Sequence, residues 1–361
     1  MSRLDQLALT ACGCLTSVGL SYKQTCSSIR AGITRFNEHG YYDCLGPDPE
    51  WDDEEPLTSS AVATIDPFLD GPERLFSLAI PPLKELIANS KLNRDDLGRT
   101  AFLLALPQEE PALVNWPLDN RFATELLGRT GMAAVSHSET DRGGHTGIFS
   151  LIQRARVLID SKKVDFCILG GVDSYLLEER LDYLDEQRRI KSERNLDGYI
   201  PGEAGCMLLL ERPDQATERG LSPLAFIAQA GSAREANSYL SEKTSTGKGL
   251  TLALKQIIET ECPPWVLCDL NGEGYRAMEW GLVLNRMAAT FDPLPRLDHP
   301  ADCLGDSGAA TGGLLLAGVA HAFGQGYHPA DRALLWTAAD DGKREALIVE
   351  NFLGVTDGRI Y

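Results

Sequence analysis

The chain alternates short apolar runs with amphipathic segments, and this alternation begins again after residue 220. Apolar runs of strand length lie at residues 7–17, 100–106, 164–169 and 205–211, and then at 223–230, 265–270, 333–338 and 345–351. Segments with helical spacing separate them, at residues 21–30, 75–90, 144–160, 213–220, 249–260 and 312–323. Strands that alternate with helices predict an α/β fold with largely parallel, buried sheets. The restart predicts two related halves, residues 1–220 and 221–361.

The charge of the chain limits its partners. The formal net charge is −18, and such a negative field repels nucleic acid and anionic membranes. Acids gather at residues 45–60, which also contain three prolines, and charged residues again fill 184–195, so both segments are predicted to be exposed. No apolar run reaches the roughly 18 residues of a membrane helix. The N-terminus lacks the basic-then-apolar order of a signal peptide, and we expect a cytoplasmic protein.

The nine cysteines are scattered and include no CxxC pair. Cys12 and Cys14 are too close in sequence for ordinary zinc spacing, and Cys167 and Cys206 lie inside apolar runs. We therefore expect reduced thiols that pack in the core. Neither a P-loop pattern nor a dinucleotide-binding glycine pattern follows a predicted strand, so we expect no cofactor.

Glycine-rich turns next to predicted strands and helices carry the most specific patterns. Residues 143–147, Gly-Gly-His-Thr-Gly, begin a helix, and the strand at residues 164–174 ends in Gly-Gly-Val-Asp-Ser. Residues 197–211 read Asp-Gly-Tyr-Ile-Pro-Gly-Glu-Ala-Gly-Cys-Met-Leu-Leu-Leu-Glu. Two later turns are Asp-Leu-Asn-Gly-Glu-Gly at 269–274 and Leu-Gly-Asp-Ser-Gly-Ala-Ala-Thr-Gly at 304–312.

These segments resemble the motifs of the β-ketoacyl synthases in the thiolase superfamily, from about residue 130 to the end, and most specifically at residues 197–211. The resemblance implies a thiolase-like five-layer α/β/α/β/α fold of two related halves. It also implies a homodimer, formed edge to edge near the strand that precedes the turn of the nucleophile. A synthase of this family docks an acidic acyl carrier protein on a basic patch. This chain is strongly acidic, so we do not expect it to bind an acyl carrier protein.

The resemblance also assigns the active-site positions, and every one of them is changed. The catalytic Cys of the family is replaced by His145, and its two His residues by Glu273 and Asp306. Ala301 stands at the position of the family's Lys, and Leu353 at that of the Phe that gates the pocket. We therefore predict a degenerate active site.

The substitutions reverse the chemistry of condensation. A synthase needs a thiolate at a helix N-terminus and two His side chains that stabilise negative charge on the thioester oxygen. Two carboxylates would instead oppose that charge, by on the order of 4 kcal/mol per contact at about 4 Å and an effective dielectric constant near 20. An acyl-imidazole is also hydrolytically labile. We expect no Claisen condensation.

Three functions stay open. The first and favoured one is a non-enzymatic adaptor or scaffold that binds a partner protein, in some pathway such as secretion, because an intact fold signature surrounds a dismantled site. The second is an acyltransferase or hydrolase for acyl thioesters that uses His145, Glu273 and Asp306 as base or as a divalent-metal set. No ligand spacing supports a metal, and the simpler arrangement is a filled pocket in which the acids accept hydrogen bonds. The third is a condensing enzyme with Cys303 as nucleophile.

Overall fold

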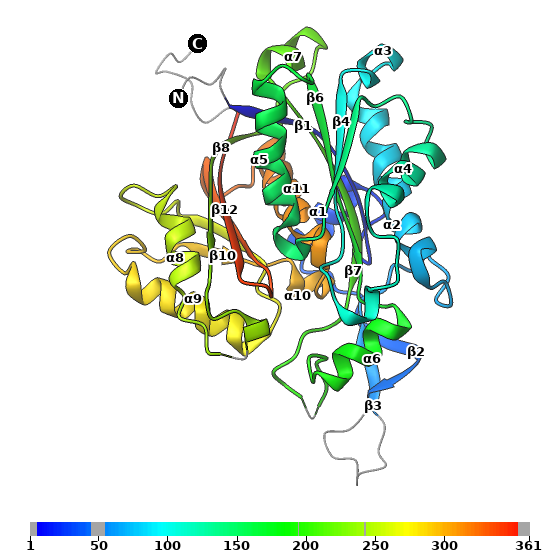
Figure 1. Cartoon of the computed structure of the whole chain (residues 1–361). Helices are drawn as coiled ribbons and strands as arrows, with labels where there is room; N and C mark the ends of the chain where they lie inside the picture. Colours follow the sequence, from blue (N-terminus) through cyan, green and yellow to red (C-terminus); the bar gives the residue numbers. More distant parts are fainter. Residues whose placement is uncertain (1–5, 45–54, 194, 242, 353–361) are drawn as a thin grey trace.

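The computed structural model describes residues 6–44, 55–193, 195–241 and 243–352, and Figure 1 shows its course. Its strands are β1 (Leu7–Thr16), β2 (Asn37–Cys44), β3 (Glu55–Ser59), β4 (Thr100–Ala105), β5 (His137–Asp141), β6 (Phe166–Ser174), β7 (Glu203–Glu211), β8 (Ala225–Arg234), β9 (Trp265–Cys268), β10 (Arg296–Asp298), β11 (Arg332–Ala338) and β12 (Lys343–Glu350). Its α-helices are α1 (Tyr22–Arg30), α2 (Gly71–Ser90), α3 (Arg94–Leu97), α4 (Asn120–Arg129), α5 (Gly147–Asp160), α6 (Glu178–Glu186), α7 (Pro213–Glu218), α8 (Lys248–Lys255), α9 (Gly274–Arg286), α10 (Ala301–Leu304) and α11 (Thr311–Gln325). The short 3₁₀ turns η3 (Gly144–Thr146) and η5 (Gly308–Ala310) precede α5 and α11. None of the helices in the described part of the chain is both long and apolar enough to cross a membrane.

Ten of the described strands form one mixed sheet, in the order β10-β9-β11-β12-β8-β1-β7-β6-β4-β5. The pairs β4–β5, β4–β6, β9–β10 and β9–β11 are parallel. The pairs β1–β7, β1–β8, β6–β7, β8–β12 and β11–β12 are antiparallel, so the prediction of largely parallel sheets is wrong. Strands such as β1, β6 and β7 are buried along their whole length, and this removes the polar alternation that marks an ordinary antiparallel strand. Because β1 pairs with β8, the sheet is continuous across residues 220 and 221, and the division there stays a prediction.

The sheet and its helices form five layers (Figure 1). Helices α2 and α4 cover the outer face of the strands from the first part of the chain, and α8 and α9 cover that of β8 to β12. Helices α1, α5 and α11 lie between the two layers of strands. Separate apolar clusters fill the spaces between the layers, and burial of this apolar surface is the main force that holds them together. The predicted α/β/α/β/α architecture is confirmed.

The contact between α2 and the sheet depends on glycine. A Cβ atom at Gly205 would lie 2.1 Å from the carbonyl oxygen of Leu78, and one at Gly13 would lie 2.0 Å from that of Pro82. The two glycines therefore let the backbone of α2 lie directly on β1 and β7. Gly205 belongs to the most specific motif of the sequence, and a side chain there would push this helix layer away from the sheet.

Two segments differ from the prediction of exposed loops. Part of the acidic segment at residues 45–60 forms β3, which pairs antiparallel with β2, while residues 45–54 lie outside the described residues. In the segment 184–195, Leu184 and Ile190 are buried, and only 8% of Arg189 is exposed. The charge of this segment predicted that it is exposed. The local sequence, however, does not distinguish an arginine that is buried against carboxylates from one that is exposed to solvent.

Candidate functional site

His145 lies on the turn between β5 and α5. Gly144 adopts a φ of +52°, a left-handed conformation that suits glycine, and the Asp141 side chain accepts a hydrogen bond from the Gly143 amide at 2.6 Å. Only 4% of His145 is exposed. The turn therefore places the imidazole in the interior, at the start of a helix of the central layer.

Asp306 binds the imidazole. Its Oδ1 lies 2.8 Å from His145 Nε2 and also accepts a hydrogen bond from the Gly308 amide at 2.8 Å. Burial opposes the charged form of both side chains, but each charge stabilises the other. The Asp306 carboxylate raises the pKa of His145, and the imidazolium holds the pKa of Asp306 well below its usual range. The two residues therefore form a buried hydrogen-bonded pair in which Asp306 favours the protonated form of His145.

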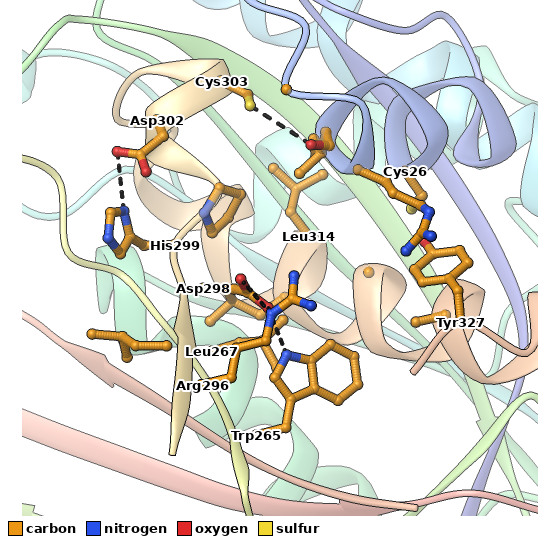
Figure 2. A pocket seen from close by; sticks show the side chains of 18 residues that line it. Cys26, Trp265, Leu267, Arg296, Asp298, His299, Asp302, Cys303, Leu314 and Tyr327 are labelled. Carbon is orange, nitrogen blue, oxygen red and sulfur yellow. Dashed lines mark hydrogen bonds and ion pairs between the residues drawn. The ribbon is translucent and has the colours of Figure 1, made fainter. Parts of the chain in front are cut away.

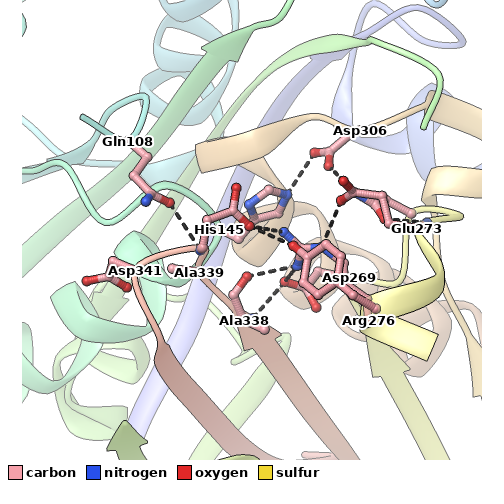
Figure 3. A network of polar contacts seen from close by, with 12 residues as sticks. Gln108, His145, Asp269, Glu273, Arg276, Asp306, Ala338, Ala339 and Asp341 are labelled. Carbon is pink, nitrogen blue, oxygen red and sulfur yellow. Dashed lines mark hydrogen bonds and ion pairs between the residues drawn. The ribbon is translucent and has the colours of Figure 1, made fainter. Parts of the chain in front are cut away.

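Glu273 reaches this pair only through Asn271. The Asn271 Nδ2 donates to Asp306 Oδ2 at 2.7 Å and to Glu273 Oε2 at 2.9 Å. On its other side Glu273 forms a bidentate ion pair with Arg189, at 2.8 Å and 2.9 Å. Figure 3 shows His145 in contact with Asp306, and Glu273 in the same group of side chains. Both oxygens of Glu273 are thus occupied by arginine, and the carboxylate is not free to act as a base.

Two further carboxylates complete the network. Arg276 lies 3.1 Å from Asp269 and 3.2 Å from Asp340, and Arg189 lies 2.6 Å from Asp340. Carboxylates outnumber guanidinium groups here, and this excess of negative charge favours the protonated form of the imidazole. We call the following set the polar network: His145, Arg189, Asp269, Asn271, Glu273, Arg276, Asp306 and Asp340.

Little space is left beside the imidazole. A cavity of about 10 Å³ lies against His145, Asn271, Asp306 and Ser307, which is room for a single water molecule at most. A larger hollow of about 360 Å³, lined in part by Phe36, Lys191, Asn271 and Glu273, shares Asn271 and Ala301 with this cavity, but neither His145 nor Asp306 lines it. The position of the former nucleophile is therefore closed to a substrate of the size of a thioester.

The geometry bears on each type of chemistry that the sequence left open. Among the described residues, no group of three or more His, Cys, Asp or Glu side chains is arranged to hold a metal ion. No described hydroxyl or thiol bonds to the imidazole, so the pair of His145 and Asp306 lacks the nucleophile of a hydrolytic triad. Cys303 lies on α10, where its Sγ is 3.9 Å from the carbonyl oxygen of Ile29, and burial raises its pKa. Cys303 does not line the cavity beside His145.

The other predicted positions are placed as follows. Ala301 begins α10 and lines the small cavity beside His145. Leu353 lies outside the described residues. His145, Glu273 and Asp306 come from three distant segments and lie in the polar network, where Asn271 is the described residue that joins Glu273 to Asp306.

Asp173, at the end of β6, supports the turn that carries Asp306. Its Oδ2 accepts a hydrogen bond from the Ala309 amide at 2.7 Å, and its Oδ1 pairs with Arg180 at 2.5 Å. Gly308, at a φ of +50°, passes so close that a Cβ atom there would lie 2.0 Å from the Asp173 carboxylate. The Gly-Gly-Val-Asp motif thus positions the second turn of the site.

Sequence reasoning missed the two arginines of the polar network. Arg276 lies one helical turn after Glu273, a spacing that favours an ion pair and that could have suggested their contact. Arg189 gave no such signal, because its partner Glu273 is 84 residues away and its own segment is rich in charge. The two carboxylates that were expected to oppose a thioester oxygen are instead held in ion pairs.

Comparisons with known proteins identify the fold. No family model and no curated protein sequence matches the chain. Its structure is similar to the ishigamide ketosynthase/chain length factor, with a TM-score of 0.78 and 16% identity over 96% of this chain and 99% of that chain. It is also similar to a type II PKS ketosynthase in complex with its acyl-carrier protein, with a TM-score of 0.76 and 12% identity over 96% and 99% of the two chains. The ketosynthase from module 6 of the bacillaene synthase of Bacillus subtilis 168 has a TM-score of 0.69 and 12% identity over 98% of this chain and 72% of its own. The chain therefore has the thiolase-like fold of the ketosynthases.

Proposed function

We propose that this chain is a non-catalytic protein with a ketosynthase fold and that it acts by binding a partner protein. The observation that carries the proposal is the hydrogen-bonded pair of His145 and Asp306, which lies beside a cavity with room for one water molecule. A condensing enzyme needs a nucleophile that a thioester can reach, and the residue at this turn is neither free nor accessible.

The electrostatics of the polar network support the absence of condensation. The Asp306 carboxylate is bonded to the imidazole and raises the pKa of His145, and this favours the protonated form, which has no lone pair with which to attack an acyl group. Glu273, at the position of one catalytic His, is held by Arg189 and cannot donate a hydrogen bond to a developing oxyanion while it is ionised. The chain therefore lacks both a side chain that could accept the acyl group and one that could stabilise the oxyanion.

The edge strand β5 is the surface that we assign to protein binding. β5 is the last strand in the order of the described sheet, and all five of its residues are half-buried. The Leu106 amide donates to the Asp141 carbonyl in the register that pairs Ala105 with Asp141, so along this parallel pair the backbones of Ser138 and Thr140 face the free edge. An unpaired edge invites another strand, and we propose that a second copy of the chain pairs there to form a homodimer.

The similar structures support a protein partner in addition to this homodimer. One of them is described as a ketosynthase/chain length factor and another as a ketosynthase with its acyl-carrier protein. For this chain a carrier protein is disfavoured, because the net charge of −18 would repel an acidic carrier. A ketosynthase-like subunit or another protein without strong negative charge fits better.

Exposure to thioesters tests the lack of catalysis. The purified chain would be incubated with acetyl-CoA, malonyl-CoA and an octanoyl thioester, beside a ketosynthase with an intact Cys as the positive control. We expect no increase in protein mass and no release of carbon dioxide from malonyl-CoA. An adduct that peptide mapping places on His145 or Cys303 would contradict the proposal.

The mass of the chain in solution tests the dimer. We expect two copies by light scattering, and a monomer for Ser138→Pro, which removes an outward amide of β5. Ser138→Ala loses the same side chain but keeps the amide, and it should stay dimeric. A monomeric wild-type chain, or a dimer that is equally stable in both variants, would contradict pairing through β5.

Co-purification from the native host tests the partner. We expect one protein to be retained in fixed stoichiometry and to bind again when both components are purified separately. His145→Asn should keep this partner, because the imidazole is buried and contributes nothing to the surface. If a folded His145→Asn variant lost the partner, binding would depend on the former active site, and the proposed surface would be wrong.

A further inference from the structure

A second cavity lies away from the polar network, between α1, α11 and the strands β9 and β10. Its volume is about 330 Å³, within the range of sites that bind small molecules, and Figure 2 shows its lining. None of the members of the polar network lines this cavity. It is therefore a separate site, and an inference about it does not depend on the proposed function.

The inner wall of this cavity is apolar. Trp265, Leu267, Leu314 and Leu315 line it, and each is at most 6% exposed. Cys303 completes the wall, and because burial raises its pKa, the thiol is neutral and behaves as a small apolar group. An apolar body in contact with this wall would be removed from water.

A glycine keeps the cavity open. Gly318 lies within α11 and lines the cavity, and a Cβ atom built there meets no other atom within 4 Å. Any larger side chain at this position would project into the empty space. Gly324 on the same helix is equally free of neighbours, but it is exposed and does not line the cavity. The helix thus contains one glycine at the cavity and one matched glycine outside it.

Two arginines stand where the cavity opens to solvent. Arg30 is exposed and stacks on the Tyr327 ring, with its guanidinium carbon 3.8 Å from the ring centre. No described carboxylate forms an ion pair with Arg30. Arg296 pairs with Asp298 through Nε at 2.9 Å, and no described residue accepts a hydrogen bond from its terminal amino groups.

The neighbouring acids are already engaged. Asp298 accepts the hydrogen bond of the Trp265 indole at 2.7 Å in addition to that of Arg296, and Asp302 Oδ1 lies 3.1 Å from His299 Nδ1, a contact that is an ion pair when His299 is protonated. Figure 2 shows Asp298 between Trp265 and Arg296, and Asp302 turned toward His299. Arg30 thus lies at the mouth of the apolar cavity without a carboxylate partner among the described residues.

We propose that this cavity binds a small carboxylic acid with a compact apolar body. The carboxylate pairs with Arg30 at the mouth, where Arg296 can add its free amino groups, and the apolar body packs inward on Trp265, Leu314 and Leu315. Arginine suits this task because its planar guanidinium can form two parallel hydrogen bonds to one carboxylate. The acid end stays near solvent, and only the apolar end is buried, which avoids the cost of burying an unpaired charge.

Calorimetric titration of the full-length chain with octanoate tests the site, with octanol as the uncharged probe of the same shape. We expect saturable binding of octanoate with one site per chain. Octanol should bind at least tenfold more weakly, and added salt should weaken octanoate binding more than octanol binding.

Matched variants separate this site from general adsorption. Gly318→Phe fills the cavity and should abolish octanoate binding, whereas Gly324→Phe places the same side chain on the same helix outside the cavity and should leave it unchanged. Arg30→Gln should weaken octanoate binding about tenfold and leave octanol binding unchanged. The proposal is overturned if the wild type does not bind octanoate, if Gly318→Phe and Gly324→Phe bind it equally, or if octanol binds as tightly as octanoate.

Discussion

The ion pair of Glu273 with Arg189 provides the sharpest test of the polar network. The substitution Glu273→Gln keeps the size and shape of the side chain and removes its charge. Only 4% of Glu273 and 8% of Arg189 are exposed, and two hydrogen bonds of 2.8 Å and 2.9 Å join them. Gln can replace one of these bonds at most, because it has only one acceptor oxygen, and it leaves a buried guanidinium short of a carboxylate partner.

The expected magnitude follows from this burial. Breaking a buried ion pair by removing one charge costs about 3–5 kcal/mol. We expect the lower end, because Arg189 keeps its contact with Asp340, and Arg276 keeps those with Asp269 and Asp340. Unfolding entropy is about 2.1 cal/mol/K per residue, or roughly 0.76 kcal/mol/K for 361 residues. A loss of about 3 kcal/mol then lowers the Tm by about 4 °C.

Thermal unfolding followed by circular dichroism measures the shift, and an exposed ion pair supplies the control. Glu125 pairs with Arg129 on the surface of α4, and the Glu125 side chain is 54% exposed. Such a pair contributes about 0–1 kcal/mol, so Glu125→Gln should lower the Tm by no more than about 1 °C. If the two Glu→Gln variants unfolded at the same temperature, the polar network would contribute no more than a surface contact, and the electrostatic reasoning would fail.

Three other measurements address separate features. The pKa of His145 is raised, so the stabilisation from its charge is complete below the unfolded-state pKa of about 6.5 and is lost as pH rises through the higher folded-state pKa. The Tm difference between wild type and His145→Asn should therefore shrink from pH 6 to pH 9. A constant difference would show that the imidazole is not charged. The pKa of Asp306 is lowered, so its contribution is present above about pH 4, and acidification to pH 5 should not remove it. Gly318→Ala places a helix-favouring residue where a Cβ meets nothing and should raise stability by about 0.5–1 kcal/mol in urea unfolding, and a loss of stability would refute the open space assigned there. Cys262, the one half-buried cysteine, should react with a thiol reagent at pH 8 before the others do, but slowly, because burial raises its pKa to about 12. The other cysteines should react only when the protein unfolds. Early labelling of several cysteines would contradict their burial.

Residues close together in the sequence could be placed from the sequence alone. The turn of residues 143–147 begins a helix, the strand before Gly170 and Gly171 is buried, and the motif at 197–211 leads into β7. Each of these features depends on local properties, such as apolar spacing and glycine at turns, which a few neighbouring residues determine. For the same reason, the positions of His145, Glu273 and Asp306 followed from the resemblance of three short turns.

What those three side chains do depends on residues that the sequence did not connect. Arg189 and Asp340 are separated by 151 residues, yet together they enclose Glu273 and Arg276. A charged residue looks the same in sequence whether it is solvated or buried, and only the packing of distant segments decides its partners.

The sequence by itself therefore determined the layered α/β architecture and the identity of the residues at the former nucleophile turn. Tertiary structure alone decided the direction of the strands, because burial on both faces erases the pattern that distinguishes parallel from antiparallel pairs. It also decided that little space is left beside His145 and that a separate cavity of about 330 Å³ opens beside Gly318. Both outcomes depend on how side chains from distant segments fill a shared volume, which no local pattern records.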